Sequence, residues 1–368
     1  MKSVSESKIL FWLSLPSLSA RKQAELIRLF GSARSLWDDF SSRTEAVRRI
    51  AGDEASAALA RFHSLDYLDM RLDGLGKDGI KVITALNPLF PKLLLQPEVN
   101  APSVLYYRGD INVFGSVCVA VVGTRACTSY GREMAKTVSA EIAAGGVTVV
   151  SGLAAGIDSY AHAAAVDAGG KTIAVLGSGL NRVTPVSNLK LYDKIIESGG
   201  LVVSEYKPDA VAAKFTFPER NRLISGISRG VVVIEAGEKS GALITARFAV
   251  EQNREVFALP GNVTSSRSAG CNNLLYDGAV FIRNGMDVLE YLSLKPVVQS
   301  EKRKIIVDKE QKKLYSLLED GIKSFDGLIE SSGLSPAELS EILLEMELND
   351  LIERDSANTF SIRYRGNT

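Results

Sequence analysis

Short apolar, β-branched runs alternate with helical stretches over residues 117–282, and this alternation limits the possible folds of the chain more than any other feature. The predicted strands are Val117–Val122, Val147–Val150, Thr172–Leu176, Leu201–Ser204, Val231–Glu235, Glu255–Leu259 and Val280–Ile282. The predicted helices between them are Tyr130–Ala144, Ile157–Ala168, Leu189–Ser198, Arg220–Ser228, Ala242–Gln252 and Asn272–Asp277. Fully apolar strands that alternate with helices indicate a parallel sheet covered on both faces. The sequence therefore predicts an α/β fold with a doubly wound parallel sheet.

Small and polar residues follow several of these strands, at the edge where a doubly wound fold binds its ligands. Glycines let backbone N–H groups approach an anion, and helix N-termini carry the positive end of a dipole. Any one such loop is more often an ordinary turn, but four loops at one edge favour an anion-binding site. Their residues are Gly123-Thr124-Arg125, Ser151-Gly152 with Gly156, Gly177-Ser178-Gly179 and Ser240-Gly241.

The stretch from Lys214 to Gly226 combines cations with aromatic rings: a lysine, two phenylalanines, a proline and two arginines precede a short apolar run. Such a mixture holds a flexible polyanion, because charges bind phosphates and rings contact bases. A loop with buried phenylalanines and solvated arginines explains the stretch by itself equally well. Its place after the fourth strand, beside the anion-binding loops, favours a nucleic-acid contact. Lys214 and Phe217 are expected to make that contact, whereas Phe215 is expected to face the core.

Motifs for cofactors, metals and catalysis are weak in this chain. The first loop lacks the three-glycine dinucleotide fingerprint and no Walker pattern occurs, so no cofactor is predicted. Three cysteines and two histidines without metal-type spacing predict no metal site. His162 is expected to be packed or half-exposed, and Asp158 to stabilise the start of a helix. Glu235 is the carboxylate with the most catalytic potential, but no catalytic residue is predicted.

The length of 368 residues predicts two or three domains. Residues 1–70 are expected to form a helical domain like a sterile-alpha-motif or helix-hairpin-helix module. Residues 71–115 contain four prolines and are expected to form a connecting segment that ends in a strand at 104–108. Residues 116–293 form the predicted core, residues 294–304 a polar linker, and residues 305–368 three helices and a wing. The N-terminal helices are expected at Lys8–Leu15, Ser19–Phe30, Ser32–Phe40 and Arg43–Ala60.

Charge is balanced over the chain, with 43 basic and 43 acidic side chains. Residues 305–368 carry 13 acidic and 7 basic side chains, a net charge of −6, which makes this winged-helix-like part a poor DNA reader. No apolar run is long enough to span a bilayer, so no membrane partner is predicted. The absence of a secretory signal and the sparse cysteines fit a reducing cytoplasm.

The motifs at the strand ends together resemble those of the DNA-processing protein A family (DprA, also called Smf). The resemblance covers essentially the whole chain and is most specific from Val119 to Leu292. Its motifs are Val122-Gly123-Thr124-Arg125, Ser151 to Asp158 with Ala161-His162, Phe215 to Arg222, Ser240 to Thr245, and Leu259-Pro260-Gly261 leading to Gly270-Cys271-Asn272. One departure is Thr184-Pro185, where many relatives have Tyr-Pro.

This resemblance implies an extended Rossmann-like core that binds single-stranded DNA, forms a homodimer, and helps to load the RecA recombinase onto incoming strands during natural transformation. It implies a binding protein, not an enzyme. Arg125 and Lys214 resemble the family's phosphate-binding cations, and Phe217 its base-contacting ring. The residues expected to bind DNA are Gly123, Thr124, Arg125, Ser151, Gly152, Gly156, Gly177, Gly179, Lys214, Phe217, Arg220, Asn221, Arg222, Ser240 and Gly241.

An enzyme is the alternative. A related Rossmann-like group, the lysine-decarboxylase-like nucleotide phosphoribohydrolases, has Pro-Gly-Gly-x-Gly-Thr and then a glutamate at the comparable strand-to-helix turn. Here residues 237–245 form that turn, and no acidic residue follows before Glu251. The missing glutamate favours binding over hydrolysis.

Overall fold

The computed structural model describes residues 4–16, 18–294, 309–321, 324–348, 352–354 and 359–362. The chain divides into two compact units, Met1–Gln299 and Ser300–Thr368, each of which is described separately below. Apart from Leu294, the predicted linker at residues 294–304 lies outside the described residues.

The larger unit is built on a mixed sheet whose nine described strands follow the order β1-β2-β6-β5-β4-β3-β7-β8-β9. Strands β3 to β9 pair in parallel, as predicted. The expectation of a purely parallel sheet is wrong at one end, because the segment predicted to be a connection supplies β1 and β2, and β2 pairs antiparallel with β6. The strands are β1 Lys81–Thr84, β2 Val104–Gly109, β3 Cys118–Val122, β4 Thr148–Ser151, β5 Thr172–Leu176, β6 Leu201–Ser204, β7 Gly230–Val233, β8 Glu255–Ala258 and β9 Val280–Phe281.

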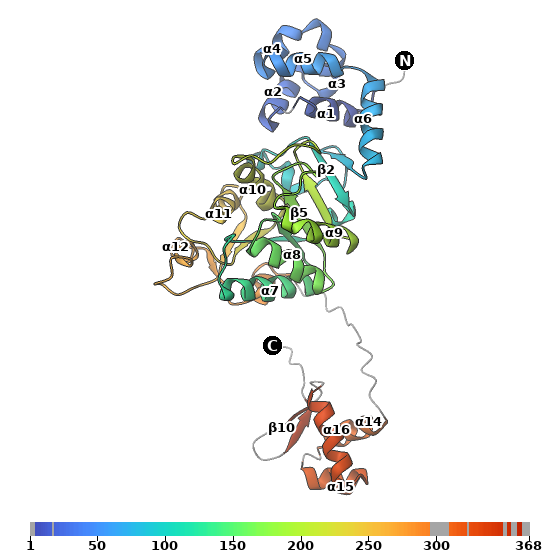
Figure 1. Ribbon diagram of the computed structural model, residues 1–368, viewed down its shortest axis with the longest axis vertical. Helices are drawn as coiled ribbons and strands as arrows, with labels where there is room; N and C mark the ends of the chain where they lie inside the picture. The colour runs from blue at the N-terminus through green and yellow to red at the C-terminus, as the bar shows by residue number, and fades with distance from the viewer. Residues whose placement is uncertain are drawn as a thin grey trace. The chain divides into compact units, whose positions relative to one another are not determined.

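Both faces of this sheet are apolar because successive side chains of a strand point to opposite faces. In β3, Val119 and Val121 pack with α7, α8 and α13, whereas Ala120 and Val122 pack with α10, α11 and α12. Figure 1 shows α7 and α8 on the other side of the strands from α10 and α11. The helices are α7 Ser129–Ala144, α8 Ile157–Asp167, α9 Leu189–Glu197, α10 Thr216–Ile227, α11 Ala242–Glu251, α12 Ala269–Tyr276 and α13 Gly285–Tyr291.

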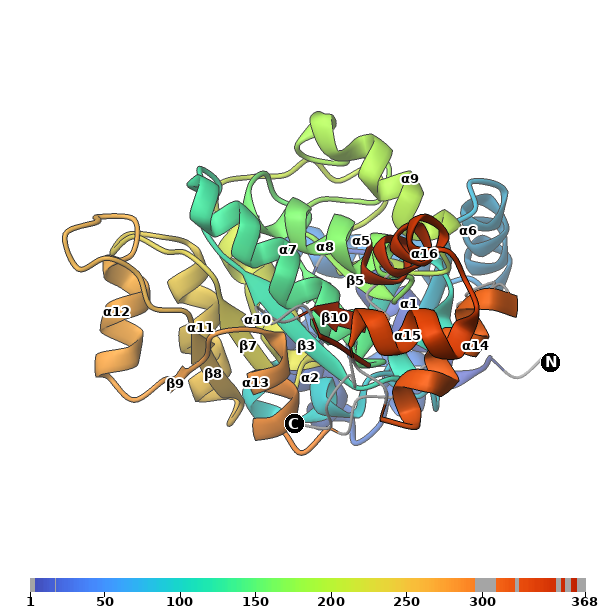
Figure 2. The same cartoon turned by 90° about the horizontal axis from the view of Figure 1, so that it is seen from below.

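The path of the chain creates a crevice in the middle of the sheet. From β3 the chain adds β4, β5 and β6 on one side, crosses back through α10, and adds β7, β8 and β9 on the other side of β3. Figure 2 shows β9, β8, β7 and β3 in this order from one end of the sheet. The adjacent carboxyl ends of β3 and β7 are therefore a topological switch point, where doubly wound proteins bind ligands.

The N-terminal helices extend to Lys77 and share a hydrophobic cluster with the sheet. Trp12 packs edge-on against Trp37, with ring centroids 5.0 Å apart, and the same cluster contains Tyr106 of β2 and Val202 of β6. The predicted helix Arg43–Ala60 is wrong as one element, because Gly52, at φ 91°, separates α4 from α5. The helices are α1 Glu6–Ser14, α2 Ala20–Phe30, α3 Ala33–Asp38, α4 Thr44–Ala51, α5 Asp53–Phe62 and α6 Leu65–Lys77; the 3₁₀ turns are Phe40–Ser42, Lys92–Leu95, Pro97–Val99, Ile111–Gly115 and Val186–Asn188.

The smaller unit confirms three helices followed by a two-stranded wing. Ser335 caps the third helix: its hydroxyl accepts a hydrogen bond from the backbone N–H of Glu338, whose carboxylate accepts one from the backbone N–H of Ser335 at 3.0 Å. The described residues of this unit have their own hydrophobic cluster, which includes Leu314, Leu343 and Phe360. The elements are α14 Lys309–Glu319, α15 Phe325–Ser332, α16 Pro336–Leu348, β10 Ile352–Arg354 and β11 Phe360–Ile362.

Candidate nucleic-acid interface

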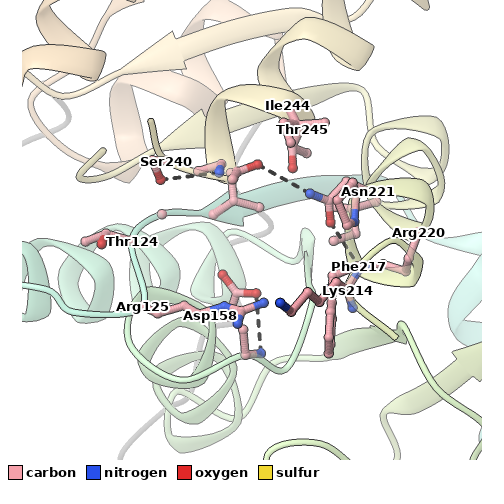
Figure 3. Close-up of a pocket in the computed structure, with 17 residues that line it drawn as sticks. Thr124, Arg125, Asp158, Lys214, Phe217, Arg220, Asn221, Ser240, Ile244 and Thr245 are labelled. Atoms are coloured by element: carbon pink, nitrogen blue, oxygen red, sulfur yellow. Dashed lines mark hydrogen bonds between the residues drawn. The ribbon is translucent and has the colours of Figure 1, made fainter. Parts of the chain in front are cut away.

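A pocket of about 460 Å³ lies at the switch point. The loop after β3, the first turns of α8 and α10, and the start of α11 line it (Figure 3). Its lining residues are Val122, Gly123, Thr124, Arg125, Ala154, Asp158, Lys214, Phe217, Pro218, Arg220, Asn221, Ile224, Ser240, Gly241, Ala242, Ile244 and Thr245. The structure therefore brings together Arg125 and the Lys214 stretch, which are about ninety residues apart in the sequence.

Two exposed cations and one aromatic ring project into this pocket. Arg125 and Lys214 are exposed, and Phe217 is half-buried. The guanidinium carbon of Arg125 lies 5.0 Å from the centroid of the Phe217 ring, a cation–π distance. Within the described residues neither cation forms an ion pair, so both remain available to an anion. Figure 3 shows them approaching from different elements, Arg125 from the β3 loop and Lys214 from the segment before α10.

The start of α11 gives the pocket a third anion-attracting element. Its ten residues begin after Ser240-Gly241, and Gly241 is exposed, with no heavy atom within 4 Å of the position that a Cβ would occupy. The Ser240 hydroxyl accepts a hydrogen bond from the backbone N–H of Ala242 at 3.3 Å. The positive end of the helix dipole therefore faces open space in the pocket.

Arg220 is buried, although the sequence analysis places it among the DNA-binding residues. Its side chain is 3% exposed. Nη1 donates to the carbonyl oxygens of Gly152, at 2.8 Å, and of Val175, and Nε donates to Asn221 Oδ1 at 3.1 Å. Burial lowers the pKa of Arg220 to about 10, so the guanidinium stays charged at neutral pH. These contacts tie α10 to the ends of β4 and β5, and a phosphate contact by Arg220 is not supported.

Asp158 occupies the backbone donors of the loop after β4. Its Oδ2 accepts hydrogen bonds from the backbone N–H of Gly152, at 3.1 Å, and of Ala154, at 3.4 Å. Burial raises the pKa of Asp158, and the nearby Arg220 guanidinium lowers it. The carboxylate thus fills the position that the glycine loop was expected to offer to a phosphate, because Gly152 N–H already has an acceptor.

The remaining glycines of the predicted set support close backbone packing. A Cβ on Gly156, at φ 81°, would lie 2.4 Å from the Thr124 carbonyl oxygen, and one on Gly179 would lie 2.1 Å from that of Lys207. Gly177 is buried beneath Phe217. Five residues that were predicted to bind DNA do not line the pocket, and four of them, all except Gly156, are buried. They are Ser151, Gly152, Gly156, Gly177 and Gly179.

Two further polar residues of α10 have partners within the protein. Arg222 forms an ion pair with Glu205, and the two side chains are 14% and 12% exposed, so Arg222 does not line the pocket. Asn221 does line it, and its Nδ2 donates to the carbonyl oxygen of Gly241 at 3.4 Å. Asn221 therefore connects α10 to the start of α11 by a hydrogen bond, whereas Arg222 connects α10 to the loop after β6 by its ion pair with Glu205.

Phe215 does not face the core as predicted, and Glu235 is not placed for the catalytic potential suggested by the sequence. Phe215 is 64% exposed, because Thr216 takes the inward position at the start of α10. Glu235 is 2% exposed, and its carboxylate accepts hydrogen bonds from the backbone N–H and the hydroxyl of Thr128, both at 2.8 Å. It orients the first turn of α7 instead of facing a substrate.

Several residues that line the pocket are missing from the set predicted from the sequence. Ala154, Asp158, Pro218, Ile244 and Thr245 line the cavity but were absent from the predicted binding set. Thr245 follows Gly241 by one helical turn, and the spacing of i and i+4 on α11 was the signal that could have found it.

His162 is fully buried, in agreement with a packed side chain. Its Nδ1 lies 2.6 Å from the Thr172 hydroxyl, which donates to the Val149 carbonyl oxygen at 2.7 Å, so Nδ1 is assigned the imidazole proton. Burial lowers the pKa of His162 to about 3. A neutral, enclosed imidazole of this kind cannot serve as a base for a ligand in the pocket.

The pKa of His162 predicts a loss of stability in acid. Between its ordinary pKa of about 6.5 and the lowered value, only the unfolded chain binds a proton at this group, so stability falls as pH falls. By pH 5 the loss from this group should reach about 2 kcal/mol. Urea unfolding at pH 7 and pH 5 measures it, and His162→Leu should lose less stability on acidification than the parent. Burial also lowers the pKa of His63, so equal losses in the two proteins would assign the effect to His63 instead.

The described part of the chain shows neither a metal-binding cluster nor a membrane-spanning helix. No group of three or more His, Cys, Asp or Glu side chains there is arranged to hold a metal ion. No described helix is both long and apolar enough to cross a membrane.

The fold and the pocket define a Rossmann-like α/β protein with a pocket at its switch point, lined by two exposed cations, and an additional winged-helix unit. The family model for DNA recombination-mediator protein A matches residues 81–293, and the DprA winged helix domain model matches residues 299–358. The chain therefore belongs to the DprA/Smf family.

Individual relatives agree with this assignment. Protein Smf of Escherichia coli (strain K12) is 37% identical over 283 residues, which are 76% of this chain and 74% of that protein. The structure of DprA from Streptococcus pneumoniae is similar with a TM-score of 0.65 and 34% identity, over 78% of this chain and 98% of that one. DprA from Helicobacter pylori, described as having a unique single-stranded DNA binding mode, has a TM-score of 0.52 and 31% identity over 58% of this chain and 95% of that one.

Proposed function

We propose that this protein is a recombination mediator that binds single-stranded DNA, protects incoming strands and helps to load a RecA recombinase during natural transformation. The observation that carries the proposal is the combination of Arg125, Lys214 and Phe217 around one open pocket. The two cations have no acidic partner among the described residues and suit phosphates, whereas the ring suits a base.

A single strand fits this pocket better than a duplex. Phe217 reaches a base only if that base is unstacked, which a single strand allows and a duplex does not. The single-stranded DNA binding mode described for the Helicobacter pylori relative supports the same ligand class. The partners proposed are therefore single-stranded DNA, the RecA recombinase and a second copy of this chain; the last two rest on the family resemblance.

No observation favours the phosphoribohydrolase alternative. Among the described residues, Asp158 is the carboxylate that lines the pocket, and its Oδ2 is held by the backbone N–H groups of Gly152 and Ala154. Hydrolysis would need a carboxylate that is free to activate water or to stabilise charge on the sugar. We therefore propose a binding function without catalysis.

Arg125→Ala and Lys214→Ala should each weaken the binding of oligo-deoxythymidine. Each substitution removes one phosphate contact, so the slope of log affinity against log salt should become shallower by about 0.7 for each variant. Fluorescence anisotropy titrations over a range of salt concentrations measure this slope.

Arg229→Ala is the matched control for these titrations. Arg229 is exposed and directly precedes β7, so it lies at the sheet edge opposite to the pocket. The Arg229→Ala substitution removes one positive charge, as the pocket variants do, and should leave the salt slope unchanged. If both pocket variants bind oligo-deoxythymidine with the parental affinity and slope, the proposed function is wrong.

A further inference from the structure

A second cavity of about 730 Å³ lies between the N-terminal helices and the loop that follows β6. Helix α6 contributes Arg71 and Lys77, and the loop contributes Lys207. The carboxylates of Asp78 and Asp209 belong to the same lining. This cavity is separate from the switch-point pocket, since the two have no lining residue in common.

The cations of this second cavity lack acidic partners among the described residues. None of the three forms an ion pair with a described residue, although two acidic residues line the same cavity. Asp209 instead accepts a hydrogen bond from Asn181 at 3.0 Å. Burial lowers the pKa of Lys207, and the charge of Arg71 lowers it further, so the two cations repel each other across the cavity. A bound anion would relieve this repulsion.

One loop links the two cavities. Residues 205–215 begin at the carboxyl end of β6, carry Lys207 in the second cavity and end with Lys214 in the first. The loop is held over the end of β5, because the backbone N–H of Gly179 donates to Ala210 and that of Asn181 to Pro208, at 2.8 and 2.9 Å. Seven residues span at most about 25 Å, so this is the upper limit for the separation of the two lysine Cα atoms.

We propose that Arg71, Lys77 and Lys207 form a second phosphate subsite, which engages the continuation of a DNA strand held at the switch point. This inference rests on the proposed function, and it assigns part of the binding of longer strands to helix α6. The lining of the second cavity contains no aromatic ring, so this subsite contacts the backbone of the strand and leaves its bases free.

An acidic protein segment is the competing occupant, because carboxylates also pair with lysine and arginine. The continuity of the loop with the switch-point pocket favours DNA. Residues 205–215 carry a lysine in each cavity, so a strand that follows this loop from Lys214 reaches Lys207.

The experiment compares oligo-deoxythymidines of about 4 and about 16 nucleotides, the usual range of single-strand site sizes. Anisotropy titrations of the full chain are made at several salt concentrations for the parent, Arg71→Ala, Lys207→Ala and the double variant. With the long strand, each single variant should reduce the salt slope by about 0.7 and the double variant by about 1.4. With the short strand the slopes should match that of the parent.

Controls separate a lost contact from a damaged fold. Lys207→Arg keeps the charge and should retain the parental slope, and Arg229→Ala removes a cation at the opposite sheet edge. A parent protein that binds neither strand would overturn the proposed function itself. A parent that binds both, with slopes unaffected by the double variant, would overturn only the second subsite. An equal change of the salt slope for both strand lengths would also overturn the second subsite. It would be overturned as well if poly-glutamate competed with DNA for the parent but not for the double variant, while the two proteins had the same salt slope for DNA.

Discussion

Arg220→Met should lower the free energy of unfolding by about 3 to 5 kcal/mol, the usual cost of removing one partner of a buried charge pair. The substitution removes the hydrogen bonds to Gly152 and Val175, which join α10 to the ends of two strands. It also leaves the buried Asp158 carboxylate without the Arg220 charge that lowers its pKa. Methionine keeps much of the side-chain volume, so the effect is electrostatic more than steric.

The loss of unfolding free energy caused by Arg220→Met should be smaller in acid than at neutral pH. Burial already raises the pKa of Asp158, and the loss of the cation raises it further. A carboxylate with a raised pKa binds its proton more tightly in the folded state, so its penalty is present above that pKa and disappears as pH falls below it. Removing the Arg220 charge also raises the pKa of His162, which acts in the same direction.

Urea unfolding of the parent and Arg220→Met at pH 7 and pH 5 tests both statements. The double variant Arg220→Met, Asp158→Asn removes both charges and should recover part of the lost stability, because no uncompensated carboxylate remains. A deficit below about 1 kcal/mol at pH 7, the scale of an exposed ion pair, would mean that Arg220 does not hold this part of the fold.

Phe217→Ala should weaken the binding of single-stranded DNA by about 1 to 3 kcal/mol, or roughly 5- to 150-fold, if the ring stacks on a base. The salt slope should change little, because the substitution removes no phosphate contact. This separates Phe217→Ala from Arg125→Ala, although the two side chains touch through a cation–π contact. Anisotropy titrations measure affinity and slope together.

Two matched substitutions make the Phe217 result specific. Phe217→Tyr keeps a ring and should bind nearly as the parent does. Phe215→Ala removes a ring two residues away that is 64% exposed but does not line the pocket, so its effect should be much smaller. Comparable losses for Phe215→Ala and Phe217→Ala would contradict the assignment of base contact to Phe217.

The sequence predicted the central strands well because their composition is unambiguous. β5 and β6 begin and end where expected, since each is a short apolar or β-branched run followed by small or polar residues. The antiparallel strand β1 was missed, because Lys81–Thr84 lies in a segment whose later prolines indicated a connection. The pairing of β2 with β6 joins residues about a hundred positions apart, and local composition carries no information about such a partner.

The sequence also indicated the edge of the sheet at which the pocket lies, but it did not show which cations of the stretch from Lys214 to Arg222 are exposed. Lys214 is exposed and Arg220 is buried, although both belong to one basic stretch. The helix was expected to begin at Arg220, but it begins at Thr216, with Pro218 in its first turn, where a missing N–H is tolerated. Counted from Thr216, positions i+4 and i+8 are Arg220 and Ile224, so Arg220 lies on the inward stripe. The burial of Arg220 depends on where the helix begins, and the composition of the stretch does not reveal that position.

The N-terminal helices and the sheet share one hydrophobic cluster, and this limits how the chain can be divided. A cut after α6 would remove the packing of α1 and α6 against β1 and β2 and would uncover Tyr106 of β2. Apolar surface of that kind promotes aggregation. The winged-helix unit, by contrast, has a separate cluster. The two compact units divide between Gln299 and Ser300. Shortened versions that keep the switch-point pocket must therefore also keep the helices at the start of the chain.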